Sequence, residues 1–193
     1  MKMYIIRHGQ TPWNARKCLQ GRSDVDLNEN RIYLAELTGK ALRDVTFDMA
    51  FTSPLIRAKH TAQCILAGRE VPIIEDERLI EISFGIYEGC CYAEENRQVP
   101  QQWIENFFHA PQDYVAAPGG ESLDDVEKRT RDFMEDICSR KELQDKTILV
   151  STHGCALRGL LNSIRESNRE DYWHGGVSKN CAVSIVTCNL SLI

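Results

Sequence analysis

The chain has 193 residues, ordinary apolar and charged fractions, and a formal net charge of −5. This length suits one domain with a large core, and the composition excludes disordered and fibrous proteins. The negative charge argues against a broad nucleic-acid or membrane-binding surface, which needs an excess of Lys and Arg, so we expect neither partner.

The predicted secondary structure alternates between strands and helices. Short apolar runs predict strands at 3–6, 48–51, 71–74, 147–151 and 181–187. Helical spacing and capping signals predict helices from 12 and at about 29–43, 55–67, 101–109, 122–140 and 156–164. Turn-rich loops are expected at 18–28 and 111–120, with an extended loop over the site at 79–89.

This alternation predicts an α/β fold: a three-layer sandwich with a mainly parallel central sheet and helices on both faces. The sequence has no internal repeat, low-complexity tract or linker. We therefore predict a single domain over 1–193.

The eight cysteines are scattered, and no Cys-x-x-Cys pair occurs that would indicate zinc. The apolar run at the start of the sequence is too short for a signal peptide, because Arg7 interrupts it. No apolar stretch is long enough to span a membrane. Several cysteines lie in apolar runs, where cysteine behaves as a small hydrophobic residue. We therefore predict a cytoplasmic protein with reduced thiols and no structural metal.

The first predicted strand runs directly into Arg7, His8 and Gly9. The carboxyl end of a parallel strand is where α/β proteins place their chemistry. Thr11 before Pro12 matches an N-cap followed by proline at the first helical position, which would aim free backbone N–H groups at the strand end. The segment therefore predicts an anion site beside a nucleophile or base, His8.

Two further strands end on residues with matching chemistry. The strand at 147–151 leads into His153 and Gly154, and the strand at 48–51 precedes Arg57 in the first turn of a helix. Parallel strands bring these ends to one sheet edge, where His153 and Arg57 would join Arg7 and His8. Arginines, imidazoles and the amide of Asn14 suit a tetrahedral phosphoryl group.

A longer ordered set of motifs surrounds these residues. It comprises Arg7-His8-Gly9 with Thr11 and Asn14, Gln20-Gly21, Ser53-Pro54-Leu55 with Arg57, Glu81 with Phe84-Gly85 and Glu88-Gly89, Pro118-Gly119-Gly120-Glu121-Ser122, and His153-Gly154 with Leu157-Arg158. This set resembles the histidine phosphatase (phosphoglycerate mutase-like) superfamily from residue 4 to about 160. Arg31 departs from the pattern, because members commonly have glycine there.

The resemblance implies a phosphohistidine mechanism. His8 would attack phosphorus, and Glu81 would act first as the general acid and then as the general base. The remaining implied residues would bind phosphate or substrate: Arg7, Asn14, Gln20, Gly21, Arg57, His153 and Gly154. Arg7, Arg57 and His153 are also expected to take part in catalysis by stabilising the transition state. No metal or cofactor is expected, because the arginines supply the electrostatics. Glu81 must start protonated, so we expect it to be partly buried or close to the phosphate.

Other glutamates near Glu81 in sequence could also serve as the general acid. Glu75, Glu77 and Glu88 lie near Glu81, and only its motif position favours Glu81. We expect the remaining histidines to be surface or structural residues: His60, His109 and His174.

Two further patterns have more than one interpretation. Trp103, Phe107 and Phe108 are expected to pack in the core or a lid, although they could instead line the substrate pocket. Cys91 and Arg97 have the spacing of a cysteine-phosphatase loop, but the segment between them contains acidic residues and no glycine, so we interpret this match as chance.

The resemblance places a substrate-facing cap at about 88–127, where we count nine acidic residues and one arginine between Glu88 and Glu127. A phosphoglycerate mutase needs extra cations there for a carboxylate and a second phosphate. The sequence therefore favours a phosphomonoesterase for a small phosphorylated metabolite with a neutral or apolar remainder; α-ribazole phosphate, a sugar phosphate and phosphoserine stay open. A cofactor-dependent phosphoglycerate mutase and a non-catalytic member that binds phosphorylated ligands are the two competing functions.

Overall fold

The computed structural model describes residues 1–28, 32–165 and 168–188. Glu29 and Arg31, at the predicted start of a helix, lie outside the described residues. The described chain forms a sheet in the order β3-β2-β4-β1-β5. Its strands are β1 (Lys2–Arg7), β2 (Met49–Thr52), β3 (Ile73–Glu75), β4 (Thr147–Thr152) and β5 (Val183–Thr187).

The sheet is mainly parallel, as predicted. β1 pairs in parallel with β4, β4 with β2, and β2 with β3, whereas β5 is antiparallel to β1. Arg7 lies opposite Thr152, and Thr52 lies opposite Ser151. The carboxyl ends of the three central strands therefore meet at one edge, which confirms the expected convergence of their following residues.

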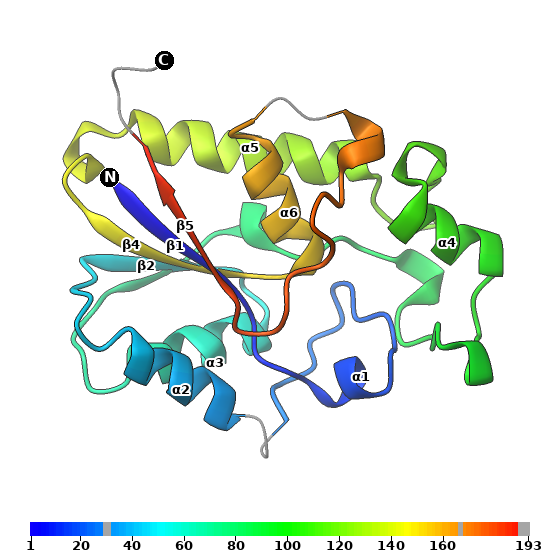
Figure 1. The fold of residues 1–193 in the computed structure, drawn as a ribbon, viewed down its shortest axis with the longest axis horizontal. Helices are drawn as coiled ribbons and strands as arrows, with labels where there is room; N and C mark the ends of the chain where they lie inside the picture. The colour runs from blue at the N-terminus through cyan, green and yellow to red at the C-terminus, as the bar shows by residue number, and fades with distance from the viewer. Residues whose placement is uncertain (29–31, 166–167, 189–193) are drawn as a thin grey trace.

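Helices cover both faces of the sheet (Figure 1). On one face lie α2 (Ile32–Ala41) and α3 (Ile56–Ile65), and on the other lie α5 (Leu123–Ser139) and α6 (Gly154–Asn162). The remaining helices, α1 (Pro12–Ala15) and α4 (Gln101–His109), lie beyond the sheet edge at which β1 and β4 end. The three-layer α/β prediction is confirmed.

The alternation of side chains along β1 explains the two cores. Met3 and Ile5 join a buried cluster with Phe133 of α5, whereas Tyr4 and Ile6 join a second cluster with Ile65 of α3. Successive side chains of a strand point to opposite faces, so a strand covered on both sides is a continuous apolar run. This arrangement holds the end of β1 rigidly in the middle of the sheet.

Local capping sets the helix starts. Ser122 and Asp125 form the predicted capping box of α5. Helix α6 starts at Gly154, earlier than predicted, with His153 as its N-cap. Helix α1 is a single turn in which the Thr11 hydroxyl accepts from the Asn14 N–H. The predicted Thr11 cap is therefore present, and it occupies the Asn14 N–H.

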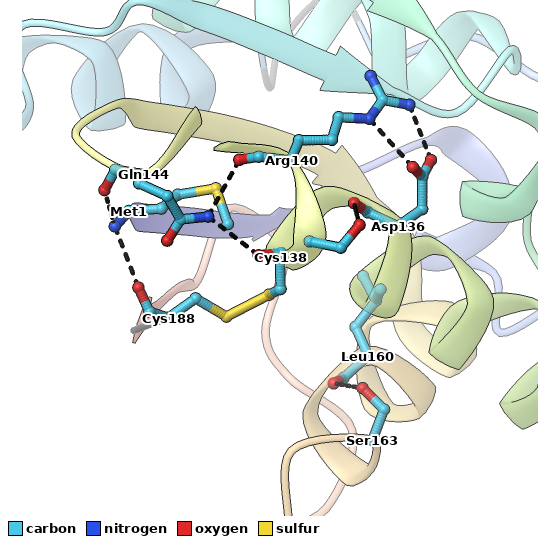
Figure 2. Close-up of a disulfide and its surroundings, with 9 residues drawn as sticks. Met1, Asp136, Cys138, Arg140, Gln144, Leu160, Ser163 and Cys188 are labelled. Atoms are coloured by element: carbon cyan, nitrogen blue, oxygen red, sulfur yellow. Dashed lines mark hydrogen bonds and ion pairs between the residues drawn. A yellow bond between two sulfur atoms is a disulfide. The ribbon is translucent and has the colours of Figure 1, made fainter. Parts of the chain in front are cut away.

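The cysteines depart from expectation. Cys18 is disulfide-bonded to Cys91, and Cys138 to Cys188, so the prediction of uniformly reduced thiols is wrong. The partners are 73 and 50 residues apart in sequence, so their spacing carried no signal. Figure 2 shows the second bridge joining α5 to the residue after β5, beside hydrogen bonds from the Met1 amino group to the carbonyls of Gln144 and Cys188. In the described part of the chain, no helix is long and apolar enough to cross a bilayer.

Candidate active site

A cavity of about 210 Å³ opens at the strand edge where β1 ends. Most of the predicted site residues line it: Arg7, His8, Asn14, Gln20, Gly21, Arg57, Glu81 and Gly154. His153 is the exception, because it lies fully buried behind Arg57 and outside the lining. The fold thus gathers residues from five separate segments.

His8 follows β1 and is held in one tautomer. Its Nδ1 lies 2.6 Å from the Gly9 carbonyl, and because a carbonyl only accepts, Nδ1 carries the hydrogen. Within the described chain, Nε2 has no hydrogen-bond partner, so its lone pair is free. Burial, followed by the charges of Arg57 and Arg7, lowers the pKa of His8 well below its usual value. His8 is therefore a neutral imidazole that can act as a nucleophile.

Arg57, in the first turn of α3, is fully buried and tightly fixed. Its guanidinium donates from Nη1 to the Ser23 carbonyl at 2.8 Å and from Nη2 to the Gly21 carbonyl at 2.7 Å. Burial lowers the pKa of Arg57 to about 10, which still leaves it charged at neutral pH. The loop before α2 thus holds the guanidinium at one angle beside His8.

His153 contacts Arg57 rather than the cavity. Its Nδ1 accepts from Arg57 Nε at 3.2 Å, and its Nε2 lies 2.7 Å from the Ser53 hydroxyl. Its ring centroid is 5.1 Å from that of His8. Both ring nitrogens are thus engaged within the protein, and His153 contacts Arg57, a predicted phosphate-binding residue. The sequence missed Ser53 as the second partner.

Arg7 ends β1, and its side chain lines the cavity, as does that of Arg57. Its Nη1 donates to the Ser178 carbonyl at 2.5 Å. Its Nε is buried without a partner among the described residues. A buried N–H without a partner is costly, so this donor indicates a site that an anion completes. Desolvation lowers the pKa of Arg7 from its usual value.

Glu81 lies against the N-terminus of α6. Its carboxylate accepts from the backbone N–H groups of Ile82, Cys155 and Ala156 at 3.0 to 3.2 Å. The helix dipole and these donors stabilise negative charge there. Glu81 is half-buried, as expected. The N-terminus of α6 therefore binds a carboxylate of the protein itself.

The predicted neutral residues have distinct positions. Asn14 Oδ1 accepts from the Thr11 N–H, which leaves its amide nitrogen available to the cavity. Gln20 Oε1 accepts from the Thr11 hydroxyl at 2.8 Å. Gly154 passes close to the site, because a Cβ there would lie 3.6 Å from Arg7 Nε. Gly9, which follows His8, does not line the cavity and packs against Leu27 instead.

Glu88 is one of the alternative candidates for the general acid. In the structure it binds the loop whose carbonyls hold Arg57. Its Oε1 accepts from the Arg22 N–H at 2.9 Å and the Phe84 N–H at 3.2 Å, and its Oε2 accepts from the Ser23 hydroxyl at 2.8 Å. The carboxylate lies directly over Gly21, whose φ is +51° and whose missing Cβ would lie 2.2 Å from Oε1. Glycine is therefore required at this position.

The remaining acidic residues near Glu81 in sequence, and the remaining histidines, lie outside the cavity. Glu75 and Glu77 are exposed, and Glu81 is the one carboxylate lining the cavity within the described segments. His60 contacts Asp26 at the surface, and the other two histidines, His109 and His174, are exposed, as predicted.

The cysteine-phosphatase spacing has no counterpart in the structure. Arg97 donates to Gln101, and Cys91 is in a disulfide, so neither residue forms an anion-binding loop. The interpretation of this spacing as chance is therefore confirmed.

Part of the cavity lining is aromatic. Phe107 and Phe108 line the cavity and also pack in a buried aromatic cluster, so both interpretations hold for these two residues, whereas Trp103 packs in that cluster without lining the cavity. The sequence missed the other lining aromatics: Phe84, Tyr92 and Trp173. Phe84 and Tyr92 precede α4, and Trp173 follows α6, so no shared periodicity connected these residues. Over the described ranges, no group of three or more His, Cys, Asp and Glu side chains could hold a metal ion.

The protein is therefore an α/β protein with a neutral histidine and two arginines around one cavity at the sheet edge. The family model of the histidine phosphatase superfamily (branch 1) matches residues 3–191. The chain belongs to this superfamily.

Relatives of the chain differ in their named activities. The chain is 34% identical over 178 residues to the 2,3-bisphosphoglycerate-dependent phosphoglycerate mutase of Cytophaga hutchinsonii, covering 89% of this chain and 81% of that protein. The structure of Bacillus stearothermophilus YhfR matches with a TM-score of 0.86 and 32% identity, over 95% of this chain and 89% of that one. The α-ribazole phosphatase of Shigella flexneri matches with a TM-score of 0.82 and 25% identity, over 98% and 92%.

Proposed function

We propose that the protein is a phosphomonoester hydrolase that uses a phosphohistidine intermediate at His8. The single observation that carries the proposal is the neutral His8, with its Nε2 lone pair free in a cavity flanked by Arg7 and Arg57. A fixed nucleophile between two cations is suited to attack on a phosphoryl group, whose equatorial oxygens bear the negative charge.

In the proposed reaction, His8 Nε2 attacks phosphorus in line with the leaving oxygen. Arg7 Nε, the second N–H groups of Arg57 and the Asn14 amide donate to the phosphoryl oxygens. His153 acts through Arg57, whose guanidinium it holds from behind. These fixed donors stabilise the transition state without reorganisation.

Glu81 is the proposed acid and base. In the proposed cycle the Glu81 carboxyl group starts with a proton, as an acid requires. It gives this proton to the leaving alkoxide and then removes one from the water that attacks the phosphohistidine. The phosphate leaves, and His8 and Glu81 return to their initial states.

The test is turnover of an aryl phosphate in the presence of a chelator. The wild type should release phosphate and form an acid-labile phosphoenzyme, and both should be lost in His8→Ala. Glu81→Gln should form the phosphoenzyme from a substrate with a good leaving group but hydrolyse it slowly. Wild-type protein with neither turnover nor phosphoenzyme would refute the proposal in favour of a non-catalytic binding protein.

Phosphoglycerate mutase activity is the second candidate, favoured by the 34% identity to a mutase. The cavity lining argues against it, because Arg7 and Arg57 are its cations within the described chain and both lie around His8. A comparison of phosphate transfer between phosphoglycerates with release of free phosphate decides between the two. Faster transfer than release would establish the mutase. We propose a small phosphorylated metabolite as substrate and the segment 88–127 as its cap.

A further inference from the structure

The aromatic side of the cavity is a continuous surface. We call it the aromatic wall and define it by Phe84, Tyr92, Phe107, Phe108 and Trp173. Its residues come from three parts of the chain: the loop before α4, α4 itself and the segment after α6. The wall lines the same cavity as the charged groups proposed to bind phosphate, so one ligand can contact both.

The rings of the wall hold one another in place. The Phe107 ring centroid lies 5.2 Å from that of Phe84, 4.9 Å from that of Phe108 and 5.1 Å from that of Trp173. The indole N–H of Trp173 donates to the Phe107 carbonyl. Edge-to-face contacts of this kind fix ring orientation. The wall is thus preformed, and a ligand does not have to order it.

The wall offers no charge to a second anion. Tyr92, Phe108 and Trp173 contribute neutral ring surface, and burial raises the pKa of the Tyr92 phenol. The two lining arginines are already tied to carbonyls beside His8. A carboxylate or second phosphate against the wall would lose its hydration without gaining a partner, which is costly.

The cavity is also small. Pockets for drug-sized ligands have volumes of about 300–1,000 Å³. At about 210 Å³, this cavity falls below that range. It therefore suits a phosphoryl group with one ring or a short branched chain attached.

We propose that the preferred substrates are small phosphate monoesters of uncharged apolar alcohols or phenols, and that Phe108 and Trp173 determine this specificity. This inference rests on the proposed function, since it takes the cations beside His8 as the phosphate site. The phosphoryl group binds between Arg7 and Arg57, and the organic group lies against the aromatic wall. The cavity discriminates against a substrate with a charged organic group, because desolvating the charge is costly. It discriminates against a substrate with an uncharged polar group, because that group makes fewer contacts with the rings.

Equilibrium binding tests the wall without requiring turnover. Calorimetry compares phenylphosphonate with 4-carboxyphenylphosphonate, a non-hydrolysable pair that differs by one carboxylate. The wild type should bind phenylphosphonate about tenfold or more tightly than the carboxylated ligand. Equal binding of the two ligands, or tighter binding of the carboxylated one, would overturn the inference.

Variants assign the preference to the wall. Phe108→Arg introduces a cation where the carboxylate would lie and should reduce the ligand ratio about tenfold or more. Trp173→Leu should weaken phenylphosphonate binding about tenfold and leave inhibition by inorganic phosphate within about twofold. Tyr87 belongs to the same aromatic cluster but does not line the cavity, so Tyr87→Leu is the matched control. It should change neither the ligand ratio nor the affinity for phenylphosphonate. Thermal melts show whether Phe108→Arg and Trp173→Leu are folded. If one of them fails to fold, the other tests the role of the wall.

The outcomes separate the two proposals. An unchanged ligand ratio in a folded Phe108→Arg protein, or unchanged phenylphosphonate binding in a folded Trp173→Leu protein, would refute the role of the wall even if the enzyme hydrolyses phosphomonoesters. A wild type that prefers phenylphosphonate, with the expected effects in both variants, but turns over no ester would retain the wall as a binding site and refute the proposed hydrolase.

Discussion

Arg57 Nε donates to Nδ1 of His153 across 3.2 Å in the buried interior of the protein. Nδ1 must therefore lack a hydrogen, which leaves Nε2 to donate to the Ser53 hydroxyl at 2.7 Å. Burial, followed by the charge of Arg57, lowers the pKa of His153 well below its usual value and keeps the ring neutral. His153 is thus an acceptor that orients the arginine, and a protonated ring could not fill this place.

The guanidinium shape of Arg57 should matter more than its charge. Arg57→Lys keeps a cation but loses the planar fork that bonds Gly21, Ser23 and His153 at once. We expect kcat/KM for an aryl phosphate to fall about 10²- to 10³-fold, as when one transition-state donor is removed.

The control for this variant is Arg69→Lys. Arg69 also donates to several backbone carbonyls, between α2 and α3, but it lies away from the cavity. The Arg69→Lys enzyme should lose thermal stability and retain the wild-type kcat/KM. An Arg57→Lys enzyme within about threefold of wild type would contradict the prediction.

Stability should fall in mild acid because of the two buried histidines. The folded-state pKa values of His8 and His153 lie well below the value of about 6.5 expected in the unfolded chain. Below pH 6.5 the unfolded chain therefore binds more protons, and the free energy of unfolding decreases as the pH falls. Each histidine contributes about 1.4 kcal/mol per pH unit in this window. Urea unfolding at pH 8, 6 and 5 measures the slope.

Two substitutions assign that slope. His153→Asn should flatten the decrease between pH 6.5 and 5, because one buried imidazole is removed. His109→Asn changes an exposed residue and should leave the slope as in wild type. Identical slopes in all three proteins would show that other groups cause the acid sensitivity.

Glu88 should affect catalysis through Arg57. Glu88→Gln weakens the bonds to Arg22 and Ser23, on the loop whose carbonyls hold the guanidinium. A shift of that loop misplaces the phosphate donors, and we expect kcat/KM to fall about 10- to 100-fold. Glu127→Gln, which breaks a contact to Arg169 outside the cavity, should leave kcat/KM unchanged.

A double-mutant cycle distinguishes positioning from general destabilisation. If Glu88 acts through Arg57, Glu88→Gln should cost little further activity in an Arg57→Lys background. Additive losses would mean that the two residues act independently, and the assigned role of Glu88 would then be wrong.

The bridge between Cys138 and Cys188 should stabilise the fold by joining α5 to the end of β5. For a sequence separation of 50 residues, chain entropy predicts a contribution of about 4 kcal/mol. Cys188→Ser should lower the free energy of unfolding by that amount, and a thiol reductant should have no further effect through this bridge. Cys64→Ser, at a free half-buried cysteine, is the control. Equal stability of both variants and wild type would contradict the prediction.

Local sequence signals predicted the parts of the molecule that depend on neighbouring residues. The apolar run of β1, the capping box at Ser122 and the helix of Gln101–His109 were all found as predicted. Each depends on contacts within a few residues or on a regular period, and the chain order of the elements then limits the topology. The convergence of Arg7, His8 and Arg57 followed from the parallel sheet.

Contacts between distant segments were not predictable in the same way. The disulfide partners, the Ser53 contact of His153 and the aromatic wall each join residues that no periodicity relates. Phe107 and Phe108 illustrate the difficulty, because an aromatic pair on a short helix has the same pattern whether it faces a core or a cavity. Only the placement of α4 relative to the sheet edge distinguishes these cases.

The sequence by itself therefore determined the α/β class, the strand ends and the placement of Arg7, His8 and Arg57 at one sheet edge, because these follow from local propensity and strand direction. Only the tertiary structure decided that His153 lies behind Arg57, that the N-terminus of α6 binds the Glu81 carboxylate, and that aromatic rings from separate segments line the cavity. These features depend on how whole elements pack against one another, and packing joins side chains that lie far apart along the chain.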